Sequence, residues 1–94
     1  MKSFGLVSGR HPLPVDAYVL DEVKDVTDVA AIRDAVRESL DAKLSADDTS
    51  IALYVTGLTV VTLEVVNYCV DHKLGLTCYH FNRDTGDYFS QVVL

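Results

Sequence analysis

The sequence lacks the features that direct a chain into or across a membrane. None of its apolar stretches reaches the roughly 18 uncharged residues that a membrane-spanning helix needs. The opening segment, MKSFGLVSGRHP, also lacks the apolar core of a secretory signal peptide. We therefore expect a cytoplasmic protein that has no membrane partner.

Cysteine is scarce, and the two that are present, Cys69 and Cys78, form no CxxC motif. We interpret them as small buried residues with free thiols. A structural zinc site would require His11, His72 or His80 to converge on them in the fold. We predict no metal and no cofactor.

Positive charge is in short supply. The chain has 8 Lys and Arg against 14 Asp and Glu, which gives a net charge of −6. Most of the acids lie between residues 16 and 48, and the simplest interpretation is a solvated face. Without a basic stripe to displace counterions, duplex nucleic acid is excluded as a partner. A small anionic ligand at a less acidic position remains compatible with this pattern.

The sequence also lacks the common catalytic and phosphate-binding motifs. It contains no GxSxG, no HExxH, no P-loop and no dinucleotide fingerprint. These absences disfavour classical hydrolase chemistry. Any reaction would have to use a nucleophile that the substrate itself carries.

What the sequence does contain is a strand–turn–helix stretch from Ile51 to Gly75. A continuous apolar strand, Ile51–Val55, runs into Thr56-Gly57-Leu58-Thr59, and a helix-length segment follows over 59–73. Gly75 is expected to stop that helix. A buried strand, a glycine turn and a helix N-terminus form half of a nucleotide-binding α/β unit, and phosphate is favoured at such a turn.

The remaining segments complete one domain over residues 1–94. Strands are expected over 3–8 and 15–20, and a helix capped by Thr27 should follow. The turn over 82–87 should join two final strands, 76–81 and 88–94, as a hairpin. We predict an α/β fold: a small Rossmann-like three-layer sheet of order β-β-α-β-α-β-β, mostly parallel, with a C-terminal antiparallel hairpin.

The two helices differ in how much apolar surface they offer. The first carries one stripe, made of Val29, Ile32, Val36, Leu40 and Leu44. The second carries two apolar sides, separated by polar arcs that include Glu64; the sides are Val61, Val65, Tyr68 and Cys69, and Leu63, Val66 and Val70. This surface is wider than a sheet requires, which suggests contact with a second copy.

The candidate site lies where the first and third strands end. If these strands are neighbours, Ser8-Gly9-Arg10-His11 lies beside Thr56-Gly57-Leu58-Thr59. The first loop offers a hydroxyl, a guanidinium and an imidazole, and the second offers backbone N–H groups and hydroxyls; together they suit a phosphodiester. The alternative is purely structural: the glycines make turns, Thr59 caps a helix and Arg10 is solvated.

Arg10 and His11 are also the candidate catalytic residues. The 2′-hydroxyl of an RNA-like ligand can attack its own phosphate, so the protein would only orient it and stabilise charge without a metal. We interpret His80 as a packed or surface strand residue, His72 as favourable at a helix C-terminus, and Arg83 and Asp84 as turn residues.

Two segments carry a resemblance to a known family. The first strand leading into Ser8-Gly9-Arg10-His11-Pro12-Leu13-Pro14, and Tyr54-Val55-Thr56-Gly57-Leu58-Thr59, resemble the small Rossmann-like (CARF-type and ring-nuclease-like) accessory proteins of type III CRISPR systems. The resemblance implies a homodimer whose cleft holds a cyclic oligoadenylate, bound or slowly cleaved. By position, Ser8, Arg10 and His11 would meet ribose and phosphate, and Thr56, Gly57 and Thr59 would cradle phosphate.

Two other functions stay open. A phage or mobile-element protein could inhibit a defence complex through its acidic face, on which Asp34, Glu38 and Asp41 lie. A plain oligomerisation module would bind no ligand at all. The residues do not decide whether a ligand is cut or only bound.

Overall fold

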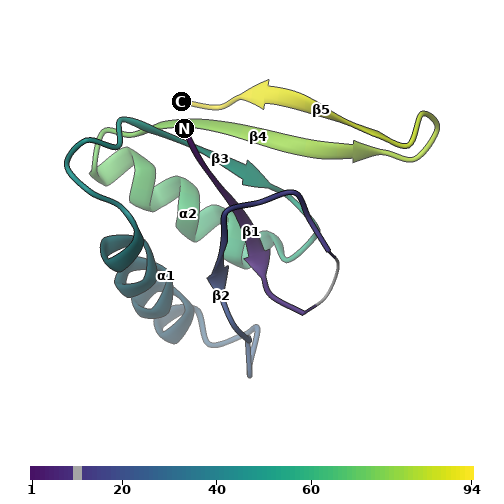
Figure 1. The fold of residues 1–94 in the computed structure, drawn as a ribbon. Helices are drawn as coiled ribbons and strands as arrows, with labels where there is room; N and C mark the ends of the chain where they lie inside the picture. Colours follow the sequence, from purple (N-terminus) through teal and green to yellow (C-terminus); the bar gives the residue numbers. More distant parts are fainter. Residues whose placement is uncertain (10–11) are drawn as a thin grey trace.

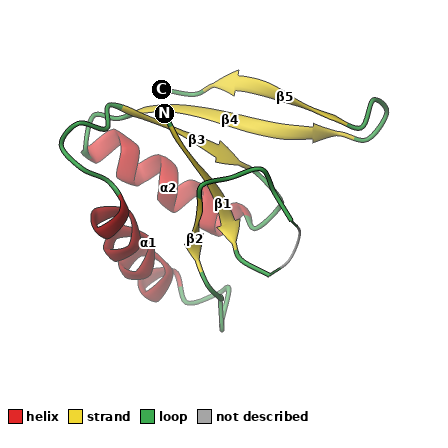
Figure 2. Ribbon diagram, viewed as in Figure 1, coloured by secondary structure: helices red, strands yellow, loops and turns green. Residues whose placement is uncertain are grey.

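The structure is a computed structural model, and it describes residues 1–9 and 12–94. In chain order the elements are β1 (Lys2–Val7), β2 (Ala17–Leu20), α1 (Val29–Lys43), β3 (Ser50–Tyr54), α2 (Thr59–Asp71), β4 (Gly75–Asn82) and β5 (Asp87–Val92). This series confirms the predicted α/β class and the order β-β-α-β-α-β-β, as Figure 2 shows.

The described strands form a five-stranded sheet in the order β2-β1-β3-β4-β5. Four strands run parallel to their neighbours, and β5 runs antiparallel to β4. The mostly parallel sheet and the C-terminal hairpin are therefore confirmed. Because β1 pairs directly with β3, with Gly5 aligned to Tyr54, the carboxyl ends of these two strands lie side by side.

Both helices lie on the same face of the sheet and pack against each other (Figure 1). The chain moves across the sheet in one direction from β2 to β3 to β4, and right-handed crossovers in one direction place their helices on one face. The expectation of three layers is therefore wrong, because the helices form a single layer. On the opposite face, the side chains of Leu13 and Tyr18 lie against Gly5.

The core lies between the helix layer and the sheet. On α1 the stripe residues Ile32, Val36 and Leu40 are buried, as their four-residue spacing predicts. The helix begins one residue later than expected, because Asp28 is the N-cap and accepts a hydrogen bond from the Ala31 N–H. Thr27 does not cap it; its hydroxyl donates to Asp25 at 2.6 Å.

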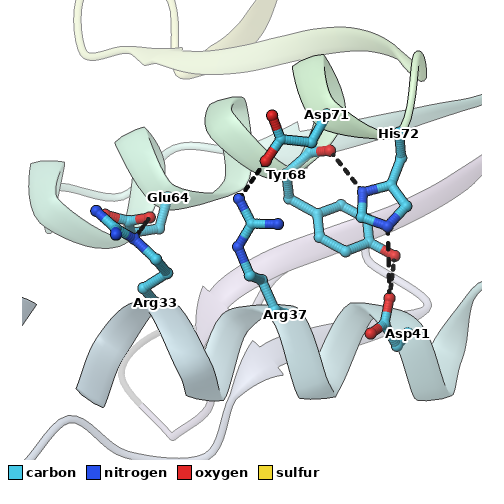
Figure 3. Close-up of polar contacts among 7 residues, drawn as sticks. All are labelled: Arg33, Arg37, Asp41, Glu64, Tyr68, Asp71 and His72. Carbon is cyan, nitrogen blue, oxygen red and sulfur yellow. Dashed lines mark hydrogen bonds and ion pairs between the residues drawn. The ribbon is translucent and has the colours of Figure 1, made fainter. Parts of the chain in front are cut away.

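On α2 the first predicted apolar side is buried in full: Val61, Val65, Tyr68 and Cys69. Part of the second side stays in solvent, since Leu63 and Val70 are 56% and 55% exposed. Glu64, expected on a polar arc, is only 5% exposed. Its carboxylate lies 3.2 Å from Nε of Arg33 on α1, within the polar contacts that join the two helices in Figure 3.

The end of α2 is formed by Lys73 rather than by a glycine. Lys73 has a φ of 54°, in the left-handed region. The N–H of Lys73 donates to Val70 and the N–H of Leu74 donates to Cys69, which is the pattern of a left-handed helix stop. Gly75, expected at this stop, is instead the first residue of β4.

Candidate ligand-binding site

A pocket of about 620 Å³ lies at the edge of the sheet where the parallel strands end. β4 continues past its last pairing with β3, at Tyr54–Tyr79, as far as Asn82, so the β4–β5 hairpin projects beyond β3 (Figure 1). The hairpin forms one wall, and the segments that follow β1 and β3 form the others. The lining residues are Pro12, Leu13, Val55, Thr56, Gly57, His80, Phe81, Arg83 and Tyr88.

This edge is also the switch point of the sheet. From β1 the chain turns to β2 on one side, and from β3 it passes through α2 to β4 on the other. Connections that diverge from adjacent parallel strands leave a crevice between them, where ligands of open α/β sheets bind. The pocket therefore occupies the position that the topology favours.

The turn between β3 and α2 has a strained backbone. Gly57 and Leu58 follow each other with φ values of 93° and 46°. Glycine tolerates this region, but leucine does so at a cost, and strain of this kind tends to be kept at functional sites. Leu58 is the N-cap of α2 and has no side-chain hydrogen bond there. The first N–H groups of α2 therefore lack a side-chain acceptor in the described chain.

Aromatic rings form the hairpin wall. Phe81 and Tyr88 line the pocket, and their ring centroids lie 5.4 Å apart at a steep angle. Behind them, Tyr54 stacks on Tyr79 at 4.9 Å and meets Tyr88 edge to face at 5.0 Å. These contacts fix the rings in place, so the wall presents a rigid aromatic surface.

Two basic side chains lie on the same hairpin. Nε2 of His80 lies 2.9 Å from Oε1 of Gln91, which orients the imidazole at the pocket wall. Arg83 lies in the turn, which is held by a hydrogen bond from the Gly86 N–H to Asn82 O. No carboxylate within residues 1–9 and 12–94 forms an ion pair with Arg83. Its guanidinium is therefore available to an anion.

Only some of the predicted site residues lie at this edge of the sheet. Thr56 and Gly57 line the pocket, whereas Leu58 and Thr59 begin α2 beside it. Ser8 and Gly9 do not line it; the Ser8 hydroxyl donates to Asp21 O at 3.2 Å, and Gly9 makes a turn with a φ of 79°. Arg10 and His11 lie outside the described residues.

Sequence reasoning missed the hairpin wall of the pocket. His80 was predicted as a packed or surface strand residue and Arg83 as a turn residue, and Phe81 and Tyr88 were assigned only to strands. The available signal was an arginine in a hairpin turn flanked by aromatic residues. This signal could not locate the pocket, because how far β4 extends beyond β3 depends on the strand register.

The other histidine and cysteine residues that the structure describes do not form a further site. Cys69 and Cys78 are buried free thiols, as predicted. Among the described residues, no three His, Cys, Asp or Glu side chains form a group that could hold a metal ion. None of the helices in that part of the chain is long and apolar enough to cross a membrane.

The fold and the pocket define a small Rossmann-like α/β domain with a candidate ligand site at its switch point. No family model matches the chain, and neither a curated protein nor a solved structure is significantly similar to it.

Proposed function

We propose that this chain binds a phosphodiester ligand of the cyclic oligoadenylate class in the switch-point pocket. The observation that carries the proposal is the meeting, in one pocket, of the glycine turn after β3 with the aromatic and basic wall of the hairpin. The first provides backbone N–H groups, and the second provides flat rings and a guanidinium. Phosphate and nucleobase require these two kinds of surface.

Each part of the pocket has a counterpart in such a ligand. A guanidinium without a carboxylate partner forms charge-assisted, bidentate hydrogen bonds to phosphate. Phe81 and Tyr88 offer surfaces on which a base can stack, worth roughly 1–3 kcal/mol per base. Thr56 adds a hydroxyl beside Gly57. In a chain with a net charge of −6, this basic and aromatic wall is the surface best suited to an anion.

The proposed role is to lower the free level of a cyclic oligoadenylate second messenger in type III CRISPR defence. Sequestration needs only the binding just described. Slow cleavage would use the ligand's own 2′-hydroxyl, with the protein orienting it and stabilising charge without a metal. Arg10 and His11 remain the residues proposed for that step, and His80 adds an imidazole at the pocket wall.

The alternative function, inhibition of a defence complex through the acidic face, has less support. Arg33 and Arg37 of α1 are ion-paired with Glu64 and Asp71 of α2, which places cations within that face. Asp41 is engaged by the Tyr68 hydroxyl. A surface that imitates nucleic acid needs a continuous run of negative charge, and here two arginine side chains lie among the acids.

Binding of labelled cyclic tetra-adenylate to the purified protein tests the proposal. Arg83→Ala should weaken binding ~10-fold or more, because it removes a charge-assisted contact. Phe81→Ala should weaken it through lost stacking, and Arg10→Ala tests the loop that precedes Pro12. Lys24→Ala is the matched control, since this exposed lysine lies outside the pocket. No retention at micromolar protein, or equal affinity in all variants, would contradict the proposal.

A further inference from the structure

The outer edge of the sheet at β5 has the features of a contact between two copies of this chain. β5 spans six residues, DYFSQV, and pairs with β4 on one side only. A strand at a sheet edge presents unpaired N–H and C=O groups that another strand can bind. The contrast with the opposite edge is clear, because β2 has only four residues.

The pairing with β4 shows which backbone groups of β5 point outward. Just past β5, the N–H groups of Val93 and Leu94 both donate to Leu76 O, which is a β-bulge. This bulge fixes which residues of β5 point their N–H groups toward β4 and which point them outward. Counting back from Val93 along the antiparallel register, Phe89 and Gln91 turn their N–H groups toward β4. Tyr88, Ser90 and Val92 therefore turn theirs away from the sheet.

This edge lacks the usual protections against strand pairing. In natural proteins, edge strands are protected against pairing with another chain by lysine, proline, short length, a central bulge or a covering segment. β5 contains no lysine, arginine or proline, its bulge lies beyond Val92, and its one acid, Asp87, is at its start. Because the one charge of β5 lies at its start, two identical edges can meet with little repulsion, even in a chain of net charge −6.

Exposed apolar side chains are concentrated at the same edge. Phe89 and Val92 are 54% and 77% exposed, and Val93 and Leu94 follow them as exposed apolar residues. On α2 only two large apolar side chains, Leu63 and Val70, are exposed to a similar extent, and no strand edge accompanies them. The comparison favours β5 over α2 as the contact.

We propose that two copies of this chain pair antiparallel along β5, with Ser90 of one copy opposite Ser90 of the other. A two-fold axis perpendicular to the strand makes the two copies of β5 antiparallel. The outward N–H and C=O groups of Tyr88 in each copy then pair with those of Val92 in the other. This register also places Tyr88 beside Val92 across the interface, an aromatic and β-branched pair. One continuous sheet then runs through both copies.

The interface keeps the two ligand pockets apart. Antiparallel pairing sends the two hairpin tips in opposite directions, and each pocket lies beside its own hairpin. Each copy would therefore bind ligand by itself, in contrast to the shared cleft that the family resemblance implies. The inference stands independently of the proposed ligand.

Sedimentation velocity from micromolar to near-millimolar concentration tests the proposed dimer. The wild type should show twice the mass of one chain, and Ser90→Pro, which removes an outward N–H, should show the mass of one chain with an unchanged circular dichroism spectrum. Ser90→Ala keeps the N–H and should remain dimeric. Leu63→Lys and Val70→Lys on α2 should also remain dimeric.

Amide hydrogen exchange provides a readout that does not depend on the proline variant. The amides of Tyr88, Ser90 and Val92 should become protected as concentration rises, while those of Phe89 and Gln91 stay protected throughout. Val92→Lys, which adds a charge to the edge, should abolish that change. A wild type that stays monomeric, a dimer that persists in Val92→Lys, or a dimer that is lost in Leu63→Lys would overturn the proposal.

Discussion

The hydroxyl of Tyr68 on α2 donates a hydrogen bond to Oδ1 of Asp41 on α1, with 2.7 Å between the two oxygens (Figure 3). The Tyr68 ring also stacks on His72 at 3.9 Å, and His72 approaches the same carboxylate at 3.8 Å. Burial, followed by the hydrogen bond to Asp41, raises the pKa of Tyr68 to about 12. The helices are thus joined by a directional contact as well as by apolar packing.

Replacing Tyr68 by phenylalanine tests this contact. Tyr68→Phe keeps the ring but loses the hydrogen bond, and the free energy of unfolding should fall by about 1 kcal/mol. Asp41→Asn should cost less, because an amide oxygen still accepts. Urea unfolding measures both. If Tyr68→Phe unfolds at the same urea concentration as the wild type, the hydrogen bond contributes nothing to stability.

Lys73 provides a prediction of increased stability. Its left-handed φ of 54° costs energy in any residue with a Cβ, and glycine removes that cost. Lys73→Gly should raise the free energy of unfolding by roughly 0.5–1 kcal/mol. The matched control is Lys43→Gly, at the last helical position of α1, which should be destabilising. A loss of stability in Lys73→Gly would contradict the assignment of the helix stop.

Gly5 leaves no room for a side chain. A Cβ at this position would lie 2.6 Å from the Tyr18 ring and 3.0 Å from Leu13. Gly5→Ala should therefore destabilise the protein by about 1–3 kcal/mol through overpacking. In a Tyr18→Ala background the same substitution should cost much less, and urea unfolding of the four proteins gives the coupling. Additive costs would mean that the ring is not the obstacle.

The sequence predicted the fold well because its signals are local. The Asp- and Gly-containing segment over 82–87 indicated the hairpin, and Gly86 does adopt a positive φ of 74°. The apolar run Ile51–Val55 indicated the central strand. Placing the turn at Gly57 beside the end of β1 required only that β1 and β3 be neighbours, which they are. The position of the glycine turn at the pocket follows from that pairing, whereas the hairpin wall does not.

What the sequence could not give depends on contacts between distant residues. Glu64 was predicted only as part of a polar arc, because nothing local reveals that Arg33 of the other helix would meet it. The single helix layer follows from the strand order, which periodicity does not report. Gly75 was the better local candidate for a helix stop, but hydrogen bonds from the Lys73 and Leu74 N–H groups ended α2 earlier.

Stability should fall in acid because of Asp48. Its carboxylate accepts hydrogen bonds from Lys2 at 2.9 Å and from the Ser45 N–H at 2.8 Å, and these, Lys2 first, lower its pKa below the ordinary 3.8. A carboxyl whose pKa is lower in the folded state stabilises the fold above its unfolded pKa and loses that effect as pH falls through the folded pKa. The urea midpoint should therefore drop between about pH 5 and pH 2.

Substituting Asp48 isolates its share of this pH dependence. Asp48→Asn removes the titrating group, so the urea midpoint should fall less steeply as the pH is lowered. The same substitution should lower stability at neutral pH. Glu38→Gln, on the exposed side of α1, is the control and should leave the fall of the urea midpoint unchanged. If the urea midpoint falls equally steeply with decreasing pH in Asp48→Asn and in the wild type, the role of Asp48 is contradicted.

The two thiols should be unreactive in the folded protein. Burial, followed by the neighbouring Cys78, raises the pKa of Cys69 to about 11, and burial also raises the pKa of Cys78. Because the thiolate is the reactive form, a thiol reagent at about pH 8 should label neither residue in native protein and both in urea. Any slow native labelling should follow the rate of unfolding, and Tyr68→Phe should accelerate it because the variant opens more often. Rapid labelling of the native chain would mean that one of the two side chains is open to solvent.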